Sequence, residues 1–233
     1  MNDITMNFDE LESELSPPSV ACVTDRGVSP SYWKRFRCYE MSHSDLKAKP
    51  SSLRKWREAA PERAEFIARI DPQVALELFE GARAEELLRH ALLRQEALQA
   101  SALLLHTPAD FRPSREHIDA LRAFVQRFER PCPLVWRADG LWEESDTYFE
   151  LCSELELIPV IDPLMWDEEE PLPHGRFYWR ILGGQGLTPR VSEFELDRLL
   201  DLCDQAEAEG WIVFSSPRME REASRFKVMV GDE

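Results

Sequence analysis

Short apolar segments that end on a charged residue constrain the fold of this chain most strongly. Residues 134–137 (LVWR) run into a turn, and residues 177–180 (FYWR) lead to the glycines Gly183 and Gly184. Between them, residues 158–162 end on a carboxylate. Strands of a parallel barrel are buried on both faces, and a barrel's functional site lies where its strands end. The pattern therefore indicates a parallel α/β barrel.

Eight apolar segments of this kind alternate with mostly helical ones. The expected strands are residues 20–24, 36–41, 64–70, 102–105, 134–137, 158–161, 177–181 and 211–214. Helices are expected over residues 51–60, 72–99, 114–130, 145–155, 192–209 and 219–230. Prolines and the lack of a helical period between residues 162 and 175 predict a loop in place of a helix. The count favours a TIM (β/α)8-type barrel over an open doubly wound sheet.

Several local signals refine these bounds. Ser114 is a candidate N-cap, Ser192 and Glu195 form a capping-box pattern, and Gly210 is placed as the glycine after a helix. Residues 1–19 are acidic and end near two prolines, so we expect an acidic flexible tail. Residues 20–233 then form a single barrel domain, a length that suits this fold.

Composition limits the partners that such a barrel can have. The chain of 233 residues is 43% hydrophobic and carries a formal net charge of -16, which repels a phosphate backbone, so nucleic-acid binding is disfavoured. A local basic pocket is compatible with this charge. No segment approaches the ~20 apolar residues of a membrane span, and the N-terminus lacks the features of an export signal. Five cysteines without a CxxC pair fit a reducing compartment, so we expect a cytoplasmic protein.

Motifs at the strand ends resemble those of the YecE-like proteins, also called domain of unknown function 72. They are YEM at residues 39–41, LRKWREAAPERAEFIARI at 53–70, LLLHTPADF at 103–111, VWRADGLW at 135–142 and FYWRILGG at 177–184. The resemblance spans about residues 20–230 and implies a TIM barrel without a settled biochemical role. It also implies a fold kinship with metal-dependent endonucleases and sugar isomerases.

The chain departs from that family at positions near the expected site. His106 stands where the family usually has glutamine, and Ala138 stands where it often has histidine. Leu182 and Gly183 replace the His-Gly pair of the family. Ser215 and Ser216 replace its paired asparagines. An activity that depends on those groups is therefore in question for this chain.

Three arginines form the first candidate site. Arg69, Arg137 and Arg180 end the third, fifth and seventh expected strands, and alternate strands of a barrel contribute to one interior layer. Guanidinium groups suit carboxylate or phosphate, and Gly183 and Gly184 follow the seventh strand, where such barrels often bind phosphate. The alternative is a structural network in which Glu40 or Asp162 neutralises each arginine.

Glu40, His106 and Asp162 end the second, fourth and sixth expected strands and are the candidate catalytic residues. One histidine and two carboxylates suit acid–base chemistry or a divalent metal. No HExxH-like spacing supports a metal site, so no metal ligands are assigned and no cofactor is evident.

Tryptophans are the other chemistry-bearing residues of these segments. Trp142 and Trp166 are expected near the barrel mouth, where an indole can stack on a ligand or pack in the core. Trp136 and Trp179 should point outward under the helices if their arginine neighbours point inward. Residues 167–170 form an acidic run, interpreted as a solvated loop that screens the mouth against polyanions.

These observations leave three functional hypotheses. The first is a cytoplasmic barrel whose anion-binding pocket takes a small phosphorylated or carboxylated ligand. If this barrel is an enzyme, its reaction is hydrolysis or phosphoester chemistry. The second is an inactive barrel that serves as a protein-interaction module, motivated by Ala138 and Leu182. The third is metal-dependent action on nucleic acid, which the net charge opposes.

Overall fold

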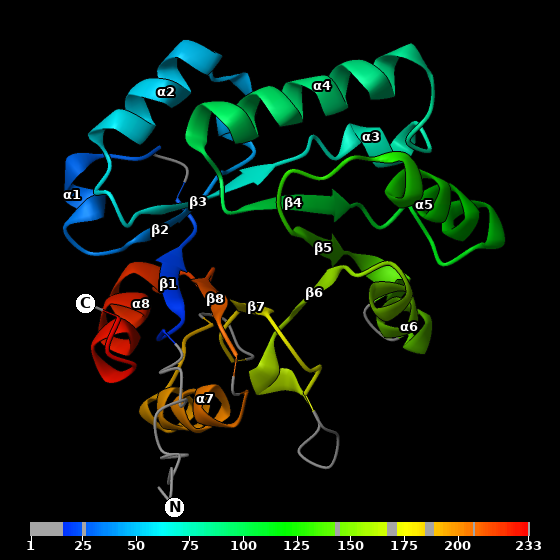
Figure 1. Cartoon of the computed structure of the whole chain (residues 1–233). Helices are drawn as coiled ribbons and strands as arrows, with labels where there is room; N and C mark the ends of the chain where they lie inside the picture. Colours follow the sequence, from blue (N-terminus) through cyan, green and yellow to red (C-terminus); the bar gives the residue numbers. More distant parts are fainter. Residues whose placement is uncertain are drawn as a thin grey trace, which may run out of the picture.

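A computed structural model describes residues 16–24, 27–142, 145–166, 172–184, 189–206 and 208–232. Eight parallel strands follow the order β1-β8-β7-β6-β5-β4-β3-β2 and curl into a barrel with the helices outside (Figure 1). The strands are β1 (Ser19–Cys22), β2 (Cys38–Glu40), β3 (Glu65–Arg69), β4 (Ala102–Thr107), β5 (Leu134–Ala138), β6 (Ile158–Ile161), β7 (Phe177–Ile181) and β8 (Gly210–Phe214). The predicted TIM-type barrel is confirmed.

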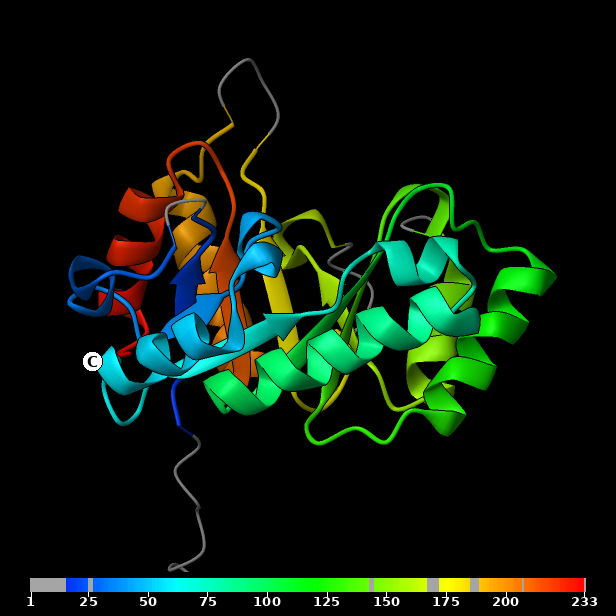
Figure 2. The ribbon, with the colours of Figure 1, turned by 90° about the horizontal axis from the view of Figure 1, so that it is seen from above.

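The helical segments alternate with these strands. They are α1 (Pro30–Trp33), η1 (Ser44–Lys47), α2 (Pro50–Ala59), α3 (Gln73–Leu76), α4 (Gly81–Leu98), α5 (Arg115–Arg127), η2 (Gly140–Trp142), α6 (Asp146–Glu154), η3 (Pro163–Met165), α7 (Glu193–Ala206) and α8 (Met219–Met229). Figure 2 shows α4 lying along the outside of the sheet, against β3. Between β6 and β7, the described residues contain only the short η3, as the predicted loop requires.

Two expectations about helices were wrong. Residues 72–99 do not form one helix, because Leu78 and Phe79 take positive φ values of 49° and 60° and separate α3 from α4. Gly210 does not end α7 but is the first residue of β8. A Cβ at Gly210 would lie 2.5 Å from the Phe177 ring, so the glycine permits close packing of β7 and β8. The short α1 had not been predicted.

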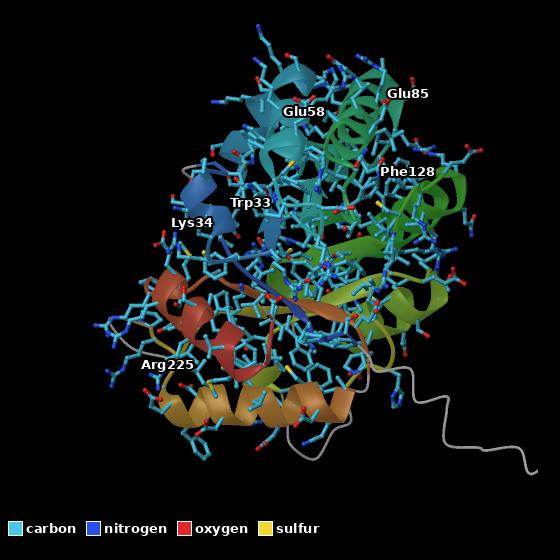
Figure 3. The ribbon with its side chains drawn as sticks, turned by 60° about the vertical axis from the view of Figure 1, so that its left-hand side comes forward. Trp33, Lys34, Glu58, Glu85, Phe128 and Arg225 are labelled. Atoms are coloured by element: carbon cyan, nitrogen blue, oxygen red, sulfur yellow. The ribbon has the colours of Figure 1, made fainter. Side chains whose placement is uncertain are left out.

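The two signals for helix starts, at Ser114 and at Ser192 with Glu195, are confirmed. The Glu195 N–H donates to Ser192 Oγ over 3.2 Å, and Glu195 Oε2 accepts from the Ser192 N–H over 2.7 Å. The His117 N–H donates to Ser114 Oγ over 3.3 Å at the start of α5. Arg225 of α8, labelled in Figure 3, pairs with Glu193 at the start of α7. These local contacts fix the ends of outer helices.

Side chains alternate between the barrel interior and the layer under the helices. The interior apolar cluster consists of Ala21, Cys38, Ile67, Ala102, Leu104, Val135, Tyr178, Trp211 and Val213. Trp136 and Trp179 belong to the outer core, as predicted, and are fully buried there. Since side chains two positions apart share a face, Arg137 and Arg180 point into the barrel.

Side chains close the barrel between β1 and β2, which are the two ends of the hydrogen-bonded order. The Tyr32 hydroxyl lies 2.7 Å from the Cys38 carbonyl oxygen and 3.4 Å from that of Cys22. Near the other end of the seam, Asp232 accepts the Val20 N–H over 3.0 Å and pairs with Arg37. The seam is thus held by a hydroxyl and a carboxylate.

The β5–β6 pairing is also reinforced by a side chain. Its register covers only two residue pairs, one of which contains Pro159, which has no N–H to donate. The Tyr148 hydroxyl accepts the Val160 N–H over 2.9 Å and donates to the Trp136 carbonyl over 2.6 Å. This contact lies directly beneath the candidate site.

Candidate functional site

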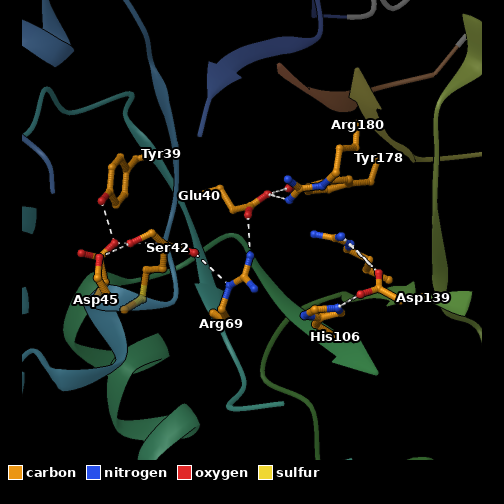
Figure 4. A network of polar contacts seen from close by, with 12 residues as sticks. Tyr39, Glu40, Ser42, Asp45, Arg69, His106, Asp139, Tyr178 and Arg180 are labelled. Atoms are coloured by element: carbon orange, nitrogen blue, oxygen red, sulfur yellow. Dashed lines mark hydrogen bonds and ion pairs between the residues drawn. The ribbon is translucent and has the colours of Figure 1, made fainter. Parts of the chain in front are cut away.

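A buried ion cluster lies inside the barrel near the carboxyl ends of the strands (Figure 4). Glu40 of β2 is fully buried and pairs with Arg180 of β7 and with Arg69 of β3, whose Nη2 lies 2.8 Å from Glu40 Oε1. The Tyr178 hydroxyl donates to the oxygen that Arg180 contacts. Two guanidinium groups on one carboxylate leave the cluster with one excess positive charge.

The charges around Glu40 determine its protonation. Burial raises the pKa of the Glu40 carboxyl, but the charges of Arg180 and Arg69 outweigh burial and lower that pKa to about 2. Burial lowers the pKa of the Arg180 guanidinium, and the Glu40 charge reverses that effect and raises it. Glu40 and Arg180 are therefore both ionised at neutral pH.

Arg180 has a polar atom that the cluster does not use. Its side chain is 7% exposed, and its Nε has no hydrogen-bond partner among the described residues. Arg69 differs, because its Nε donates to the Met41 carbonyl over 3.0 Å. A buried donor without a partner is costly, so the Arg180 Nε is a place where a ligand oxygen would be stabilised.

A second polar group lies at the ends of β4 and β5. His106 Nε2 lies 2.7 Å from Asp139 Oδ2, and Arg137 Nε donates to Asp139 Oδ1 over 3.1 Å. Burial raises the pKa of Asp139, but the hydrogen bond from His106 and the charge of Arg137 outweigh it and leave that pKa below its ordinary value. Asp139 therefore orients both His106 and Arg137.

Asp162 has different partners from those expected. Its Oδ2 accepts the Leu182 N–H over 2.9 Å, and its Oδ1 accepts the Leu164 N–H over 3.1 Å at the start of η3. Neither of these bonds involves an arginine. Burial raises the pKa of Asp162 even though these two backbone hydrogen bonds lower it. In the alternative that Glu40 or Asp162 neutralises each arginine, Glu40 takes that part for Arg69 and Arg180, whereas backbone N–H groups occupy the oxygens of Asp162.

A pocket of about 370 Å³ opens at the carboxyl ends of β5, β6 and β7. Its polar wall contains Arg137, Asp139, Asp162 and Arg180, and its apolar wall contains Trp142, Tyr148, Phe149, Val160, Met165 and Trp166. Arg137 is 31% exposed, whereas Arg180 forms part of the buried floor. The pocket thus combines one accessible cation, one buried cation and an aromatic side.

The predicted site residues divide between two places. Arg69 and Arg180 share Glu40, Arg137 lies apart with Asp139, and only Arg137 and Arg180 line the pocket. The single cluster of three arginines that the strand positions suggested does not form. The ion network takes Arg69 and Arg180, as the structural alternative has it, whereas anion binding at Arg137 and Arg180 stays a prediction.

Gly183 and Gly184 connect β7 to the segment before α7. Gly183 has a φ of +83°, and a Cβ there would lie 3.1 Å from the Arg190 nitrogen. The Gly184 N–H donates to the Arg190 carbonyl over 3.1 Å. These contacts hold the two ends of the loop together, and the chain itself accepts the Gly184 N–H.

Among the described residues, no group of three or more His, Cys, Asp and Glu side chains is arranged to hold a metal ion. Glu40 is engaged by two arginines and a tyrosine, and His106 by Asp139. The described part of the chain therefore offers no ready ligand set at the three candidate positions.

The two tryptophans expected at the mouth differ. Trp142 is fully buried, donates to the Phe111 carbonyl and stacks on the Phe111 ring, as its core-packing interpretation predicts. Trp166 is partly buried, lines the pocket and meets the Phe149 ring edge-on at 5.1 Å. The acidic run at residues 167–170 lies outside the described residues.

Two residues of the site were missed. Tyr178 lies two positions before Arg180, so strand alternation alone places both side chains in the barrel. Asp139 follows β5 directly and could have been recognised as the partner of a strand-end arginine. His106 and Arg137 are neighbours in the β4–β5 register, which sequence alone does not give.

A larger cavity of about 650 Å³ lies at the opposite end of the barrel, beside the start of β8. Several of its charged groups are paired with their neighbours: Glu65 accepts from Ser19 and Trp211, and Arg176 pairs with Glu209 at 2.9 Å. Conserved chemistry of this fold class lies at the carboxyl ends of the strands, so the smaller pocket is the candidate site.

The fold and the site define a parallel TIM-type barrel with a buried Arg–Glu–Arg cluster beside an open pocket at the strand ends. The chain is similar to a DUF72 family protein from Enterococcus faecalis, at 15% identity and a TM-score of 0.65, over 87% of this chain and 92% of that one. It is also similar to a DUF72 family protein from Thermotoga maritima, at 18% identity and a TM-score of 0.64, over 86% and 87%.

A third structure, that of SacUVDE, matches at 11% identity and a TM-score of 0.54, over 86% of this chain and 82% of that one. No protein-family model and no curated protein matches the sequence. At these identities the similarity is one of fold. The two DUF72 structures support the family assignment that the strand-end motifs indicate.

No helix of the described residues is both long and apolar enough to cross a membrane.

Proposed function

We propose that this chain is a diverged YecE-like barrel that binds a small phosphorylated or carboxylated ligand in the pocket at the ends of β5, β6 and β7. The observation that carries the proposal is Arg180. Arg180 lines the pocket, its side chain is buried, and its Nε has no partner among the described residues. A ligand oxygen there would satisfy this donor and offset the excess charge of the Arg69–Glu40–Arg180 cluster.

Arg137 supplies the second anion contact. It lines the same pocket and is partly exposed, so it can reach a ligand without leaving the barrel wall. Asp139 competes for this guanidinium, but His106 shares the Asp139 carboxylate and disperses its charge. The net charge of -16 opposes a polyanion and leaves a small anion as the partner.

For a reaction, the group that suits a general acid is Asp162. It lines the pocket, and burial raises the pKa of its carboxyl above the ordinary value. His106, held by Asp139, suits the part of a base. These groups favour hydrolysis or phosphoester chemistry. A cytoplasmic setting fits the five free cysteines.

A thermal-shift screen of wild type and Arg137→Ala tests the anion site. It covers phosphates, sugar phosphates, nucleotides, carboxylates and divalent metals. A ligand at about 100 times its dissociation constant should stabilise wild type by ~2.7 kcal/mol, and the same ligand should stabilise Arg137→Ala much less. A screen in which no anion raises the wild-type Tm, while Arg137→Ala lowers it, contradicts the proposal and makes the arginine structural.

The second candidate is a protein-interaction module without activity. Met165 and Leu182 line the pocket and are 63% and 52% exposed, which is an apolar rim that a partner could cover. Leu182 is also a position that departs from the YecE-like motif. A Met165→Ser/Leu182→Ser variant that loses a protein partner but keeps every small-anion response would favour this candidate.

A further inference from the structure

The aromatic residues that line the pocket restrict the class of ligand further than the arginines do. Trp166 follows η3 and lines the pocket, and the Phe149 ring meets it edge-on at 5.1 Å with an interplanar angle of 88°. This contact holds the indole in one orientation. Trp142 is fully buried behind the same wall, fixed by its bond to the Phe111 carbonyl. The apolar lining of the pocket is therefore largely aromatic.

Met165 lies next to this wall at the rim. Its side chain is 63% exposed and lines the pocket. A thioether is polarizable and adapts to the edge of an aromatic ring. Trp166 and Met165 thus contribute an aromatic ring and a flexible thioether to the lining of the same pocket.

The polar groups decide which ring-bearing molecules fit. An indole face attracts cations, but Arg137 and Arg180 line the same pocket and repel them. The excess positive charge of the Arg69–Glu40–Arg180 cluster attracts one anionic group. The pocket volume of about 370 Å³ lies near the small end of the ~300–1,000 Å³ range of ligand pockets. One or two rings fit such a volume.

We propose that the ligand is a small aromatic acid, whose anionic group binds Arg180 Nε and Arg137 and whose planar ring packs against Trp166 and Met165. This inference rests on the proposed anion site and adds the aromatic class of the ligand. The shared chemistry is a ring with one anionic group, which is either a carboxylate or a phosphate.

Isothermal titration calorimetry tests the proposal on the full chain with matched probes. The aromatic anions are indole-3-acetate and phenyl phosphate, the anions without a ring are acetate and inorganic phosphate, and the neutral ring is indole-3-ethanol. We expect each aromatic anion to bind at least about tenfold more tightly than its ringless match and than the neutral ring. The ratio of the two aromatic anions distinguishes carboxylate from phosphate.

Variants of the pocket residues test whether the ring of the ligand packs against Trp166 and Met165. Trp166→Leu should weaken the binding of the aromatic anions by roughly 2- to 12-fold, which is the range expected for the loss of an aromatic pair. The affinities for acetate and inorganic phosphate should stay unchanged. Phe194→Leu is the matched control, since Phe194 is a 76% exposed aromatic residue on α7 outside the pocket lining. Met165→Ala, at an exposed position, provides a second test if Trp166→Leu does not fold.

The possible outcomes separate the two proposals. If ringless anions bind as tightly as aromatic ones, or if both pocket variants leave the aromatic preference intact, the aromatic class is wrong and the anion site stands. If indole-3-ethanol binds as tightly as indole-3-acetate, or if no anion binds at all, the anion site fails and the aromatic acid fails with it.

Discussion

Glu40 of β2 and Arg180 of β7 form an ion pair across the barrel interior, although 140 residues separate them in the chain. Their strands are not neighbours in the sheet, because β8 and β1 lie between them. Arg69 of β3 completes the cluster on the other carboxylate oxygen. The cluster thus links both sides of the seam at which the strand order begins and ends.

Removing the charge of Glu40 should strongly destabilise the barrel. In Glu40→Gln, two buried guanidinium groups lose their carboxylate, and breaking a buried pair in this way costs about 3–5 kcal/mol. Urea unfolding of the variant measures this loss. Glu58→Gln is the control, because Glu58 is exposed on α2 and should change the free energy of unfolding by less than ~0.5 kcal/mol. Equal stability of the two variants would show that the cluster contributes nothing.

The stability difference between wild type and Glu40→Gln should depend on pH. The pKa of Glu40 is lowered from 4.5 to about 2 on folding, so its ionisation stabilises the fold fully above the unfolded value. That contribution is lost as the pH falls from about 4.5 toward 2. We therefore expect the difference in unfolding free energy to be constant near neutral pH and to shrink in acid. A difference that grows on acidification would contradict the assigned charge state.

The Tyr32 hydroxyl should contribute measurably to the closure of the β1–β2 seam. Tyr32→Phe removes a buried donor bonded to the Cys38 carbonyl over 2.7 Å, and the carbonyl is left without that partner. We expect a loss of about 1–3 kcal/mol, with faster amide hydrogen exchange in β1 and β2. β5, which lies across the barrel, is the internal control and should keep its protection. Uniformly faster exchange throughout the barrel would instead indicate a global effect.

Gly210 should be intolerant of a side chain. Its Cβ would lie 2.5 Å from the Phe177 ring, so Gly210→Ala forces ring or backbone to move, at a cost of about 1–3 kcal/mol. Phe177→Leu in the same chain should recover part of this loss. Gly184→Ala is the control, because the nearest atom to its Cβ is a Glu195 carboxylate oxygen at 3.4 Å. A fully stable Gly210→Ala would show that β7 and β8 can separate easily.

The cysteine thiols should react slowly in the native protein. Burial raises the pKa of Cys132 to about 11 and those of Cys22 and Cys203 to about 12, and it also raises those of Cys38 and Cys152. Since the thiolate is the reactive form, a thiol reagent at pH 8 should modify little native protein, and all five thiols after denaturation. Rapid reaction of a native thiol would reveal an accessible cysteine.

The sequence by itself determined the architecture and the direction of many side chains. Short apolar segments identified all eight strands, and period-two alternation placed Trp136 and Trp179 outside and Arg137 and Arg180 inside. Ser114 fixed a helix start because its hydroxyl bonds a backbone N–H three residues away. These features depend on neighbours in sequence, so the chain alone specifies them.

Only the tertiary structure decided which charged groups meet. Glu40 takes Arg69 and Arg180, and Asp162 binds backbone N–H groups instead of an arginine. Closure of the barrel sets these distances, through registers that connect strands far apart in the chain. Gly210 shows the same effect, because a helix-ending glycine and a glycine required by the Phe177 ring look identical in sequence. The sequence indicated the candidate site residues, and the closure of the barrel determined which groups they contact.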